Sequence, residues 1–154
     1  GLRDCMEKGV LAGYKVVGVK ATLYDGSYHP VDSKEMAFKE AARLAYNNAM
    51  PNAKPVLLEP IDKVVVYAPE EYTGTIMGDI TKRRGMIVDM QTTEDGEQEI
   101  VAEVPMAEIL TYANELRSMT QGRGKFTVSF ERYQDAPKDV ADKVIAAAKE
   151  KKAA

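Results

Sequence analysis

The stretch that decides the fold runs from Ile61 to Gly85 and reads IDKVVVYAPEEYTGTIMGDITKRRG. Its first part, Ile61–Tyr67, is rich in β-branched residues and predicts a strand. The next part, Pro69–Lys82, carries apolar side chains at the four-residue spacing of a helix face. Gly85 follows the basic end of that helix, where a C-terminal stop is expected. The stretch therefore predicts a strand followed by a helix.

Four further elements follow Gly85. Asp95-Gly96 is a hairpin signal between two alternating segments, and a helical period then precedes a last alternating strand. The expected elements are the strands Met86–Met90 and Gln98–Val104, the helix Met106–Arg117 and the strand Phe126–Phe130. The order β-α-β-β-α-β predicts a ferredoxin-like sandwich over residues 59–134, in which an antiparallel four-stranded sheet carries two helices on one face. A final amphipathic helix is expected within 135–154.

The preceding part of the chain has a different pattern. A short helical period over Leu2–Leu11 lacks a capping residue, so we expect the chain to start inside a larger domain. The alternation in Tyr14–Tyr24 predicts a strand. Asp32 then predicts an N-cap, because Glu35 follows at the spacing of a reciprocal capping pair.

Three prolines in the segment Pro51–Pro60 cannot continue that helix, which favours a domain boundary near residue 58. The expected fold class is thus α+β. It combines a partial unit over residues 1–58, the ferredoxin-like sandwich over 59–134 and the C-terminal helix over 135–154.

Composition excludes several classes of protein. The chain has 154 residues, of which 45% are hydrophobic and 29% charged, as in ordinary globular domains. No apolar run is long enough to span a membrane, and the first residues do not form a secretion signal. The single cysteine, Cys5, cannot form an internal disulfide and has no His or Cys cluster for zinc. We expect a cytoplasmic monomer with no membrane contact.

Motifs for catalysis are largely missing. The sequence has no phosphate-cradling loop, nucleophile elbow or metal-ligand spacing. We therefore expect no catalytic residue, no metal site and no cofactor in this chain. The one histidine, His29, lies in the turn-forming stretch Asp25–Pro30, where Asp32 is the only nearby partner for acid–base chemistry. Exposed loops held by a rigid strand and helix often serve in recognition. The functional hypothesis for this loop is therefore contact with RNA or tRNA.

Two motifs near the last strand look functional but are better explained by structure alone. Gln121–Gly124 superficially suggests a dinucleotide turn, but it joins a helix to a strand, whereas the true fingerprint follows a strand and opens a helix. Arg123–Phe130 resembles the aromatic motif of RNA recognition modules, but it falls in the fourth strand instead of the third. Phe126 and Phe130 share one phase with Val128, which predicts core aromatics.

A series of short matches, in order along almost the whole chain, resembles elongation factor G. The matching stretches are Tyr24–His29 with Val31-Asp32-Ser33 and Met36-Ala37-Phe38, Pro55–Pro60, Gly78-Asp79 with Arg83-Arg84-Gly85, Ala102–Pro105, and Leu116-Arg117-Ser118 with Thr120–Arg123. Each is weak alone, but their order and spacing are specific.

The resemblance implies that residues 1–58 are the C-terminal half of domain IV, similar to ribosomal protein S5 domain 2, and that 59–134 are domain V. It implies a C-terminal fragment of a factor that promotes GTP-dependent translocation of tRNA and mRNA on the ribosome. The GTP-binding domain is absent here, so GTP and Mg belong to the intact factor.

The resemblance also implies the sites. The tip loop that meets RNA or tRNA would comprise Asp25, Gly26, Ser27, Tyr28 and His29. The local basic clusters supply the candidates for ribosome contact in the later part of the chain, which are Arg83, Arg84, Arg117, Gln121 and Arg123. The expected partners are ribosomal RNA of both subunits, tRNA and mRNA.

A second hypothesis stays open at this point, because ferredoxin-like sheets also serve as small-ligand regulatory domains. The basic clusters at Arg83-Arg84 and Arg117–Arg123 favour the ribosome-contacting fragment. The sequence does not distinguish a housekeeping translocase from a paralogue.

Overall fold

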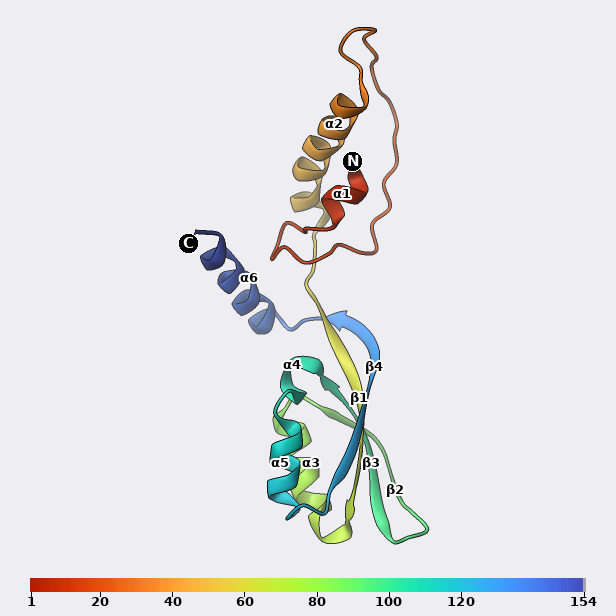
Figure 1. Ribbon diagram of the computed structural model, residues 1–154, viewed down its shortest axis with the longest axis vertical. Coiled ribbons are helices and arrows are strands. Elements are labelled where there is room, and N and C mark those ends of the chain that lie inside the picture. The colour runs from red at the N-terminus through yellow and green to blue at the C-terminus, as the bar shows by residue number, and fades with distance from the viewer. Residues whose placement is uncertain (154) are drawn as a thin grey trace. The chain divides into compact units, whose positions relative to one another are not determined.

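The computed structural model describes residues 1–153 (Figure 1). The chain forms two compact units. Unit 2 comprises Leu58–Asp135, and unit 1 comprises Gly1–Leu57 together with the segment from Ala136 onward. The structure thus groups the C-terminal helix with the first unit, whereas the sequence suggests a separate element. The α+β fold class is confirmed.

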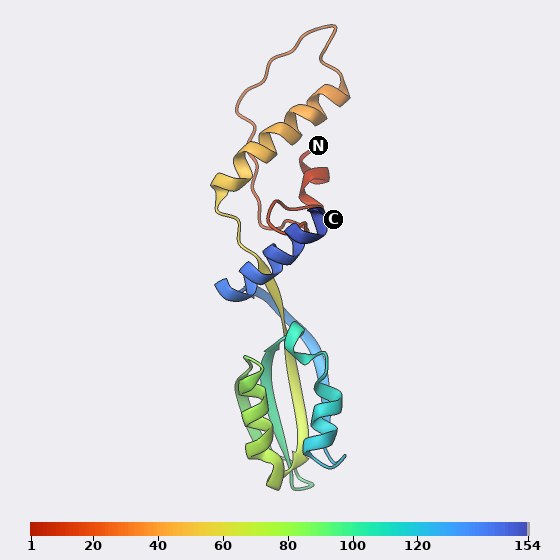
Figure 2. The ribbon, with the colours of Figure 1, turned by 90° about the vertical axis from the view of Figure 1, so that its left-hand side faces the viewer.

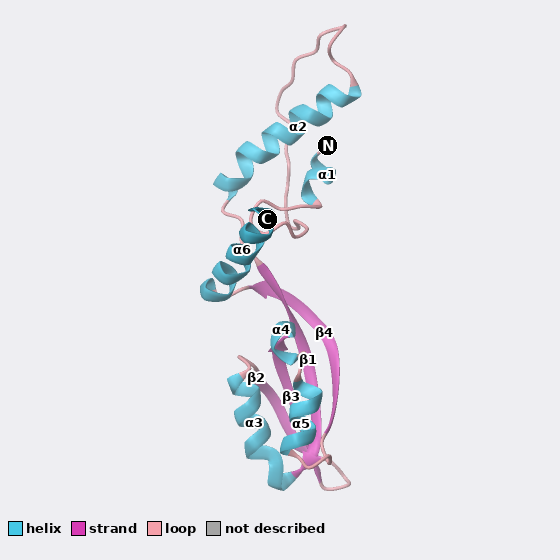
Figure 3. Ribbon diagram, turned by 60° about the vertical axis from the view of Figure 1, so that its left-hand side comes forward, coloured by secondary structure: helices cyan, strands magenta, loops and turns pink. Residues whose placement is uncertain are grey.

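Unit 2 has the predicted β-α-β-β-α-β order. The sheet is antiparallel with the strand order β2-β3-β1-β4. Both main helices, α3 and α5, lie on one face of it (Figures 2 and 3). The elements are β1 Leu58–Pro69, the 3-10 turn η2 Glu70–Tyr72, α3 Thr73–Lys82, β2 Met86–Thr92, β3 Glu97–Pro105, α4 Met106–Ile109, α5 Tyr112–Met119 and β4 Lys125–Asp135.

The core of unit 2 lies between the sheet and this helix layer. Alternate residues of β1 and β3 point into it, and two positions on each of α3 and α5 close it from the other side. Its fully buried members are Val64, Val66, Ala68, Ile76, Ile80, Ile100, Ala102, Val104, Tyr112 and Leu116. The Tyr112 ring meets Phe126 of β4 edge-on, with 5.1 Å between the ring centroids. These contacts account for the predicted two-layer sandwich.

The predicted helix Met106–Arg117 is wrong as a single element. The chain breaks after α4, and Leu110, expected in the buried stripe, is 79% exposed. α5 then starts anew after Thr111, whose hydroxyl donates a 2.8 Å hydrogen bond to Glu115. The break lets Tyr112 and Leu116 face the sheet. Similarly, the helix predicted from Pro69 begins as a 3-10 turn and becomes α-helical only at Thr73.

Gly85 ends α3 differently from the prediction. Its backbone amide donates to the Ile80 carbonyl at 2.9 Å, and the amide of Arg84 donates to Thr81 at 3.1 Å. This is a Schellman motif, and the left-handed residue in it is Arg84 with φ of 61°. Gly85 is required for another reason: a Cβ there would lie 2.8 Å from the Ile80 carbonyl oxygen and 2.9 Å from a methyl of Val104.

Unit 1 contains α1 Leu2–Met6, α2 Glu35–Ala49, the 3-10 turn η1 Met50–Ala53 and α6 Lys138–Ala153. The predicted strand Tyr14–Tyr24 is not formed. A strand needs a neighbour for its backbone N–H and C=O groups, and the described residues of unit 1 supply no second strand. Consequently, side chains of the alternating pattern are exposed, including Leu23 at 92%.

The start of α2 also corrects the sequence analysis. Asp32 is not the N-cap, because the helix begins at Glu35 and Lys34 holds the capping position without a side-chain bond. The hydroxyl of Ser33 instead accepts a 2.7 Å bond from the backbone N–H of His29. α1 is likewise shorter than the predicted Leu2–Leu11, since the chain turns after Met6 and the Gly9 amide donates to the Tyr14 carbonyl. No helix in the described part of the chain is long and apolar enough to cross a membrane.

The close approach at Gly85 leads to a test with a matched control. Gly85→Ala should destabilise unit 2 by roughly 1–3 kcal/mol, because the new methyl overpacks against backbone and Val104. Gly78→Ala, in the exposed interior of α3 with open space around it, should stabilise by about 0.5–1 kcal/mol. Urea unfolding followed through NMR signals of unit 2 would measure both. Equal effects of the two substitutions would contradict this account.

Candidate functional site

The loop Asp25–Pro30 in unit 1 is exposed along its whole length and precedes α2. Asp25 folds back on the backbone, where its carboxylate accepts a 2.7 Å bond from the amide of Gly26. Ser33 closes a second turn: its hydroxyl accepts from the His29 amide, and its own amide donates to the His29 carbonyl at 2.9 Å. The backbone of His29 is therefore held from both sides, whereas its imidazole makes no hydrogen bond to the described residues. Asp32 does not pair with it.

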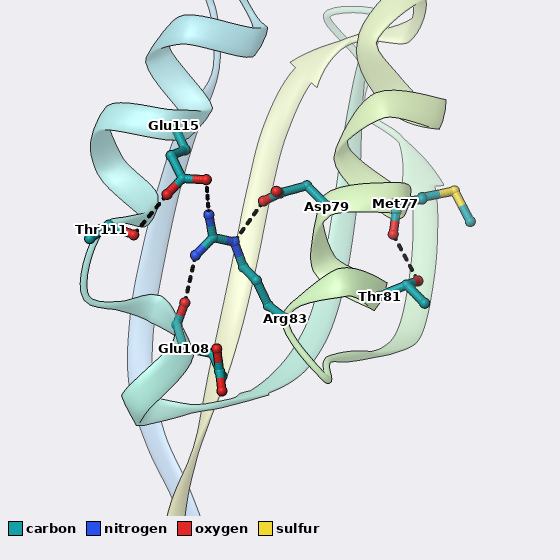
Figure 4. A network of polar contacts seen from close by, with 7 residues as sticks. All are labelled: Met77, Asp79, Thr81, Arg83, Glu108, Thr111 and Glu115. Carbon is teal, nitrogen blue, oxygen red and sulfur yellow. Dashed lines mark hydrogen bonds and ion pairs between the residues drawn. The ribbon is translucent and has the colours of Figure 1, made fainter.

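Arg83 lies inside unit 2, between the two helices (Figure 4). Its Nε donates to Asp79 at 2.7 Å, one terminal nitrogen donates to the Glu108 carbonyl at 2.6 Å, and the other pairs with Glu115. The guanidinium also lies over the Tyr112 ring, 5.1 Å from its centroid. The residue is only 8% exposed. This position argues against Arg83 as a surface contact and shows a link between α3, α4 and α5.

The electrostatics of this cluster follow from burial. Burial raises the pKa of the Tyr112 phenol; the carboxylate of Asp79 adds to the rise and the guanidinium of Arg83 opposes it. The phenol thus stays protonated and neutral beneath the cation. Because Arg83 is stacked on a ring and bonded to two carboxylates, its charge is balanced within the unit.

Arg84 is also engaged within unit 2. Two of its nitrogens donate to the carboxylate of Glu59 at 2.9 and 3.0 Å, and Nε donates to Glu108 at 3.3 Å. The hydrogen bonds with Glu59 raise the pKa of Arg84. A non-glycine residue in the left-handed region costs about 1–2 kcal/mol, which this bidentate pair offsets. The neighbouring arginines therefore both serve internal ion pairs, with different carboxylates as main partners and Glu108 in common.

The other three cationic and polar candidates lie on and after α5, in the connection to β4. Arg123 donates to Glu71 at 2.6 Å and sits 5.8 Å from the Tyr72 ring centroid, but its side chain remains more than half exposed. Arg117 and Gln121 are exposed and make no side-chain hydrogen bond or ion pair with the described residues. This connection lies at the opposite end of the sheet from α4 (Figure 1).

Gln121 adopts a left-handed backbone with φ of 52°. It ends α5 in the same manner as Arg84 ends α3, since the amide of Gly122 donates to the Arg117 carbonyl at 2.8 Å. Thr120 is fully buried and anchors the turn, because its hydroxyl donates to the Leu116 carbonyl and accepts from the Gly124 amide. The turn therefore presents the Gln121 side chain on a rigid base.

Sequence reasoning missed the partners of the arginines. Only Asp79 could have been found, because it stands four residues before Arg83 on the same helix. The other partners lie far from the arginines in the sequence, so no local pattern predicts them. They are Glu59, Glu108 and Glu115. Within residues 1–153, no group of three or more His, Cys, Asp or Glu side chains could hold a metal ion.

Comparison with known proteins agrees with this architecture. Unit 2 is an α+β sandwich, whereas the described residues of unit 1 form helices and loops, and both parts of the chain match one class of translation factor. Residues 1–54 match the family described as elongation factor G, domain IV, and residues 56–144 match elongation factor G C-terminus. The chain belongs to the elongation factor G family.

A solved structure from Thermus thermophilus is similar over nearly the whole chain. Its TM-score is 0.88 at 42% sequence identity, and the match covers 97% of this chain but 22% of that chain. This chain thus spans about a fifth of the length of the solved protein. Family membership favours an elongation factor fragment over the small-ligand regulatory domain.

The internal role of Arg83 is testable by its contrast with Arg117. Arg83→Ala should destabilise unit 2 by roughly 3–5 kcal/mol, because it leaves the Asp79 carboxylate nearly buried without its cation. Arg117→Ala should change stability by no more than about 0.5 kcal/mol, as an exposed substitution. Denaturant unfolding of both variants would measure the two changes in the free energy of unfolding. A stable Arg83→Ala protein would show that the network does not hold the helices.

Proposed function

We propose that this chain is the ribosome-contacting C-terminal part of a factor that promotes GTP-dependent translocation of tRNA and mRNA. The observation that carries the proposal is the consecutive match of residues 1–54 to domain IV and of residues 56–144 to the C-terminus of elongation factor G. The partners would be ribosomal RNA of both subunits, tRNA and mRNA. GTP and Mg would bind the remainder of the longer protein, which would act as a cytoplasmic monomer.

The contact surfaces follow from which polar groups remain available. In unit 1 these are the side chains of the loop Asp25–His29, in which Ser33 fixes the backbone of His29. In unit 2 they are Arg117 and Gln121, with Arg123 partly held by Glu71. Where the backbone is already fixed, binding costs side-chain freedom but little further backbone freedom, which favours contact with RNA. Arg83 and Arg84 support this surface indirectly by holding the helices.

The isolated chain should not hydrolyse GTP. It has no loop that cradles phosphates and no residues that would hold a magnesium ion beside them. Phosphate release by the repurified chain should equal that of a protein-free blank. Turnover that follows the protein through purification and scales with its concentration would refute this assignment.

The loop of unit 1 can be tested in the longer protein. His29→Ala should leave the fold intact, changing stability by no more than about 0.5 kcal/mol. It should slow tRNA movement and spare GTP hydrolysis, because the imidazole is exposed and the hydrolytic residues lie outside this chain. Ser33→Ala serves as a positioning control, since it removes the hydroxyl that accepts from the His29 amide and should slow movement less. Normal movement with a large loss of stability would make His29 a structural residue.

The cationic connection of unit 2 predicts a salt signature. A double substitution of Arg117 and Gln121 by Ala should weaken ribosome binding and lower the slope of log affinity against log salt by roughly 0.7–0.9, as expected for the loss of one phosphate contact. Lys149→Ala on α6 is the control, because it removes the same charge elsewhere. If both variants changed the slope equally, the effect would report net charge and not a contact.

A further inference from the structure

The face of β4 that bears the helices is only partly covered. Three of its residues pair with inward-facing residues of β1, and the pairs are Phe126 with Val66, Val128 with Val64 and Phe130 with Asp62. The β1 members are all buried. Along β4, however, the exposed fraction rises from the partly buried Phe126 to 43% at Val128 and 54% at Phe130. The prediction that Val128 and Phe130 are core residues is therefore wrong.

A β-bulge extends this uncovered surface. β1 shifts its pairing from Phe130 at Asp62 to Arg132 at Ile61, so Glu131 is the extra residue on β4. Without the bulge, Phe130 and Tyr133 would point to opposite faces, because side chains alternate along a strand. With it they lie together, at 5.1 Å between ring centroids. Val128, Phe130 and Tyr133 form a continuous apolar strip, here called the β4 stripe.

Asp62 lies beside the β4 stripe and lacks a partner. The residue is 3% exposed, and its Oδ1 has no hydrogen bond to the described residues. Burial raises the pKa of this carboxyl group. The other buried charged residues, Glu59 and Arg83, both have ion-pair partners. A buried oxygen without a donor is costly, and no donor among the described residues of unit 2 reaches Oδ1 of Asp62.

We propose that Asp62 and the β4 stripe form a docking site for a segment of a partner protein that carries a lysine or arginine between apolar residues. The apolar side chains cover Val128, Phe130 and Tyr133. The cation donates the hydrogen bond that Asp62 lacks, after a small rotation of the carboxyl group. The site is independent of the ribosome-contacting surface proposed above.

The negative charge of Asp62 favours a protein segment over nucleic acid as the ligand of this site. A carboxylate at the centre of the site opposes phosphate groups. The arginines on the flanking elements do not offset it, because Arg84 is engaged by Glu59 and Glu108, and Arg132 donates to Glu103 at 2.8 Å. Exposed aromatic rings alone could stack on bases, but every stacked base brings a phosphate group close to the carboxylate of Asp62, which a cationic peptide side chain does not.

Two matched peptides test the proposal on the 154-residue chain. Acetyl-Leu-Lys-Phe-amide carries the ammonium group, and acetyl-Leu-norleucine-Phe-amide lacks it with nearly the same shape. Titrated into ¹⁵N-labelled protein, the lysine peptide should bind about tenfold more tightly and shift the amide signals of Phe130, Tyr133 and Asp62, since one charge-assisted bond is worth roughly that factor.

Three variants separate the parts of the site. Asp62→Asn should bring the affinity ratio of the two peptides to about one, and it should fold with an equal or higher melting temperature. Phe130→Thr should weaken both peptides alike. Val88→Thr is the control, because Val88 is 54% exposed on β2, the opposite edge of the sheet, and its loss should change neither affinity.

Several results would overturn the proposal. Equal binding of the two peptides to the unchanged protein would leave no role for Asp62. Shifts confined to other residues, or an equal effect of Val88→Thr, would place any binding elsewhere. Shifts of Phe130 and Tyr133 by a single-stranded oligouridylate, without shifts by the lysine peptide, would assign the β4 stripe to nucleic acid.

Discussion

The guanidinium of Arg83 joins segments of unit 2 that are far apart in sequence. α3 has ten residues and α5 has eight, and helices of that length are not stable alone in water. Each is held by its apolar face on the sheet, and Arg83 fixes the two against each other through Asp79 and Glu115. The bond from Arg83 to the Glu108 carbonyl adds α4 to the same assembly. This one side chain therefore contacts the end of α3, the first turn of α5 and the buried ring of Tyr112.

The element order was predictable, because a β-branched run, a four-residue period and an Asp-Gly turn are local signals. The partners of Arg83 and Arg84 were not, since Glu115 lies 32 residues from Arg83 and Glu59 lies 25 from Arg84. Charge alone therefore places the basic cluster Arg83-Arg84 on the surface, whereas the structure pairs it with internal carboxylates. A charge count along the sequence gives the number of cations but not which of them already have anions.

The alternation of apolar and polar residues had the same limit as a predictor in both units, because it does not show what covers the apolar side. In β4 it correctly gave the phase of Val128 and Phe130, but whether that face is covered depends on where α5 lies and how long it is. In unit 1 it gave a strand over residues 14–24, but a strand exists only with a neighbour to accept its hydrogen bonds. Local patterns specify which side chains share a face. They do not specify what lies opposite.

The same reasoning narrows the surface available for recognition. Unit 2 holds five candidates for ribosome contact. Arg83 and Arg84 donate their hydrogen bonds to residues within the unit, and Arg123 donates one hydrogen bond to Glu71. Arg117 and Gln121 remain, at the end of the sheet farthest from the buried ion clusters. The C-terminal turn of α5 at that end is fixed by the buried hydroxyl of Thr120, so neither Arg117 nor Gln121 is needed to hold it. The residues that hold the helices together, Arg83 and Arg84, thus differ from those whose donors are free, Arg117 and Gln121. Only the second pair can be changed without loss of the fold.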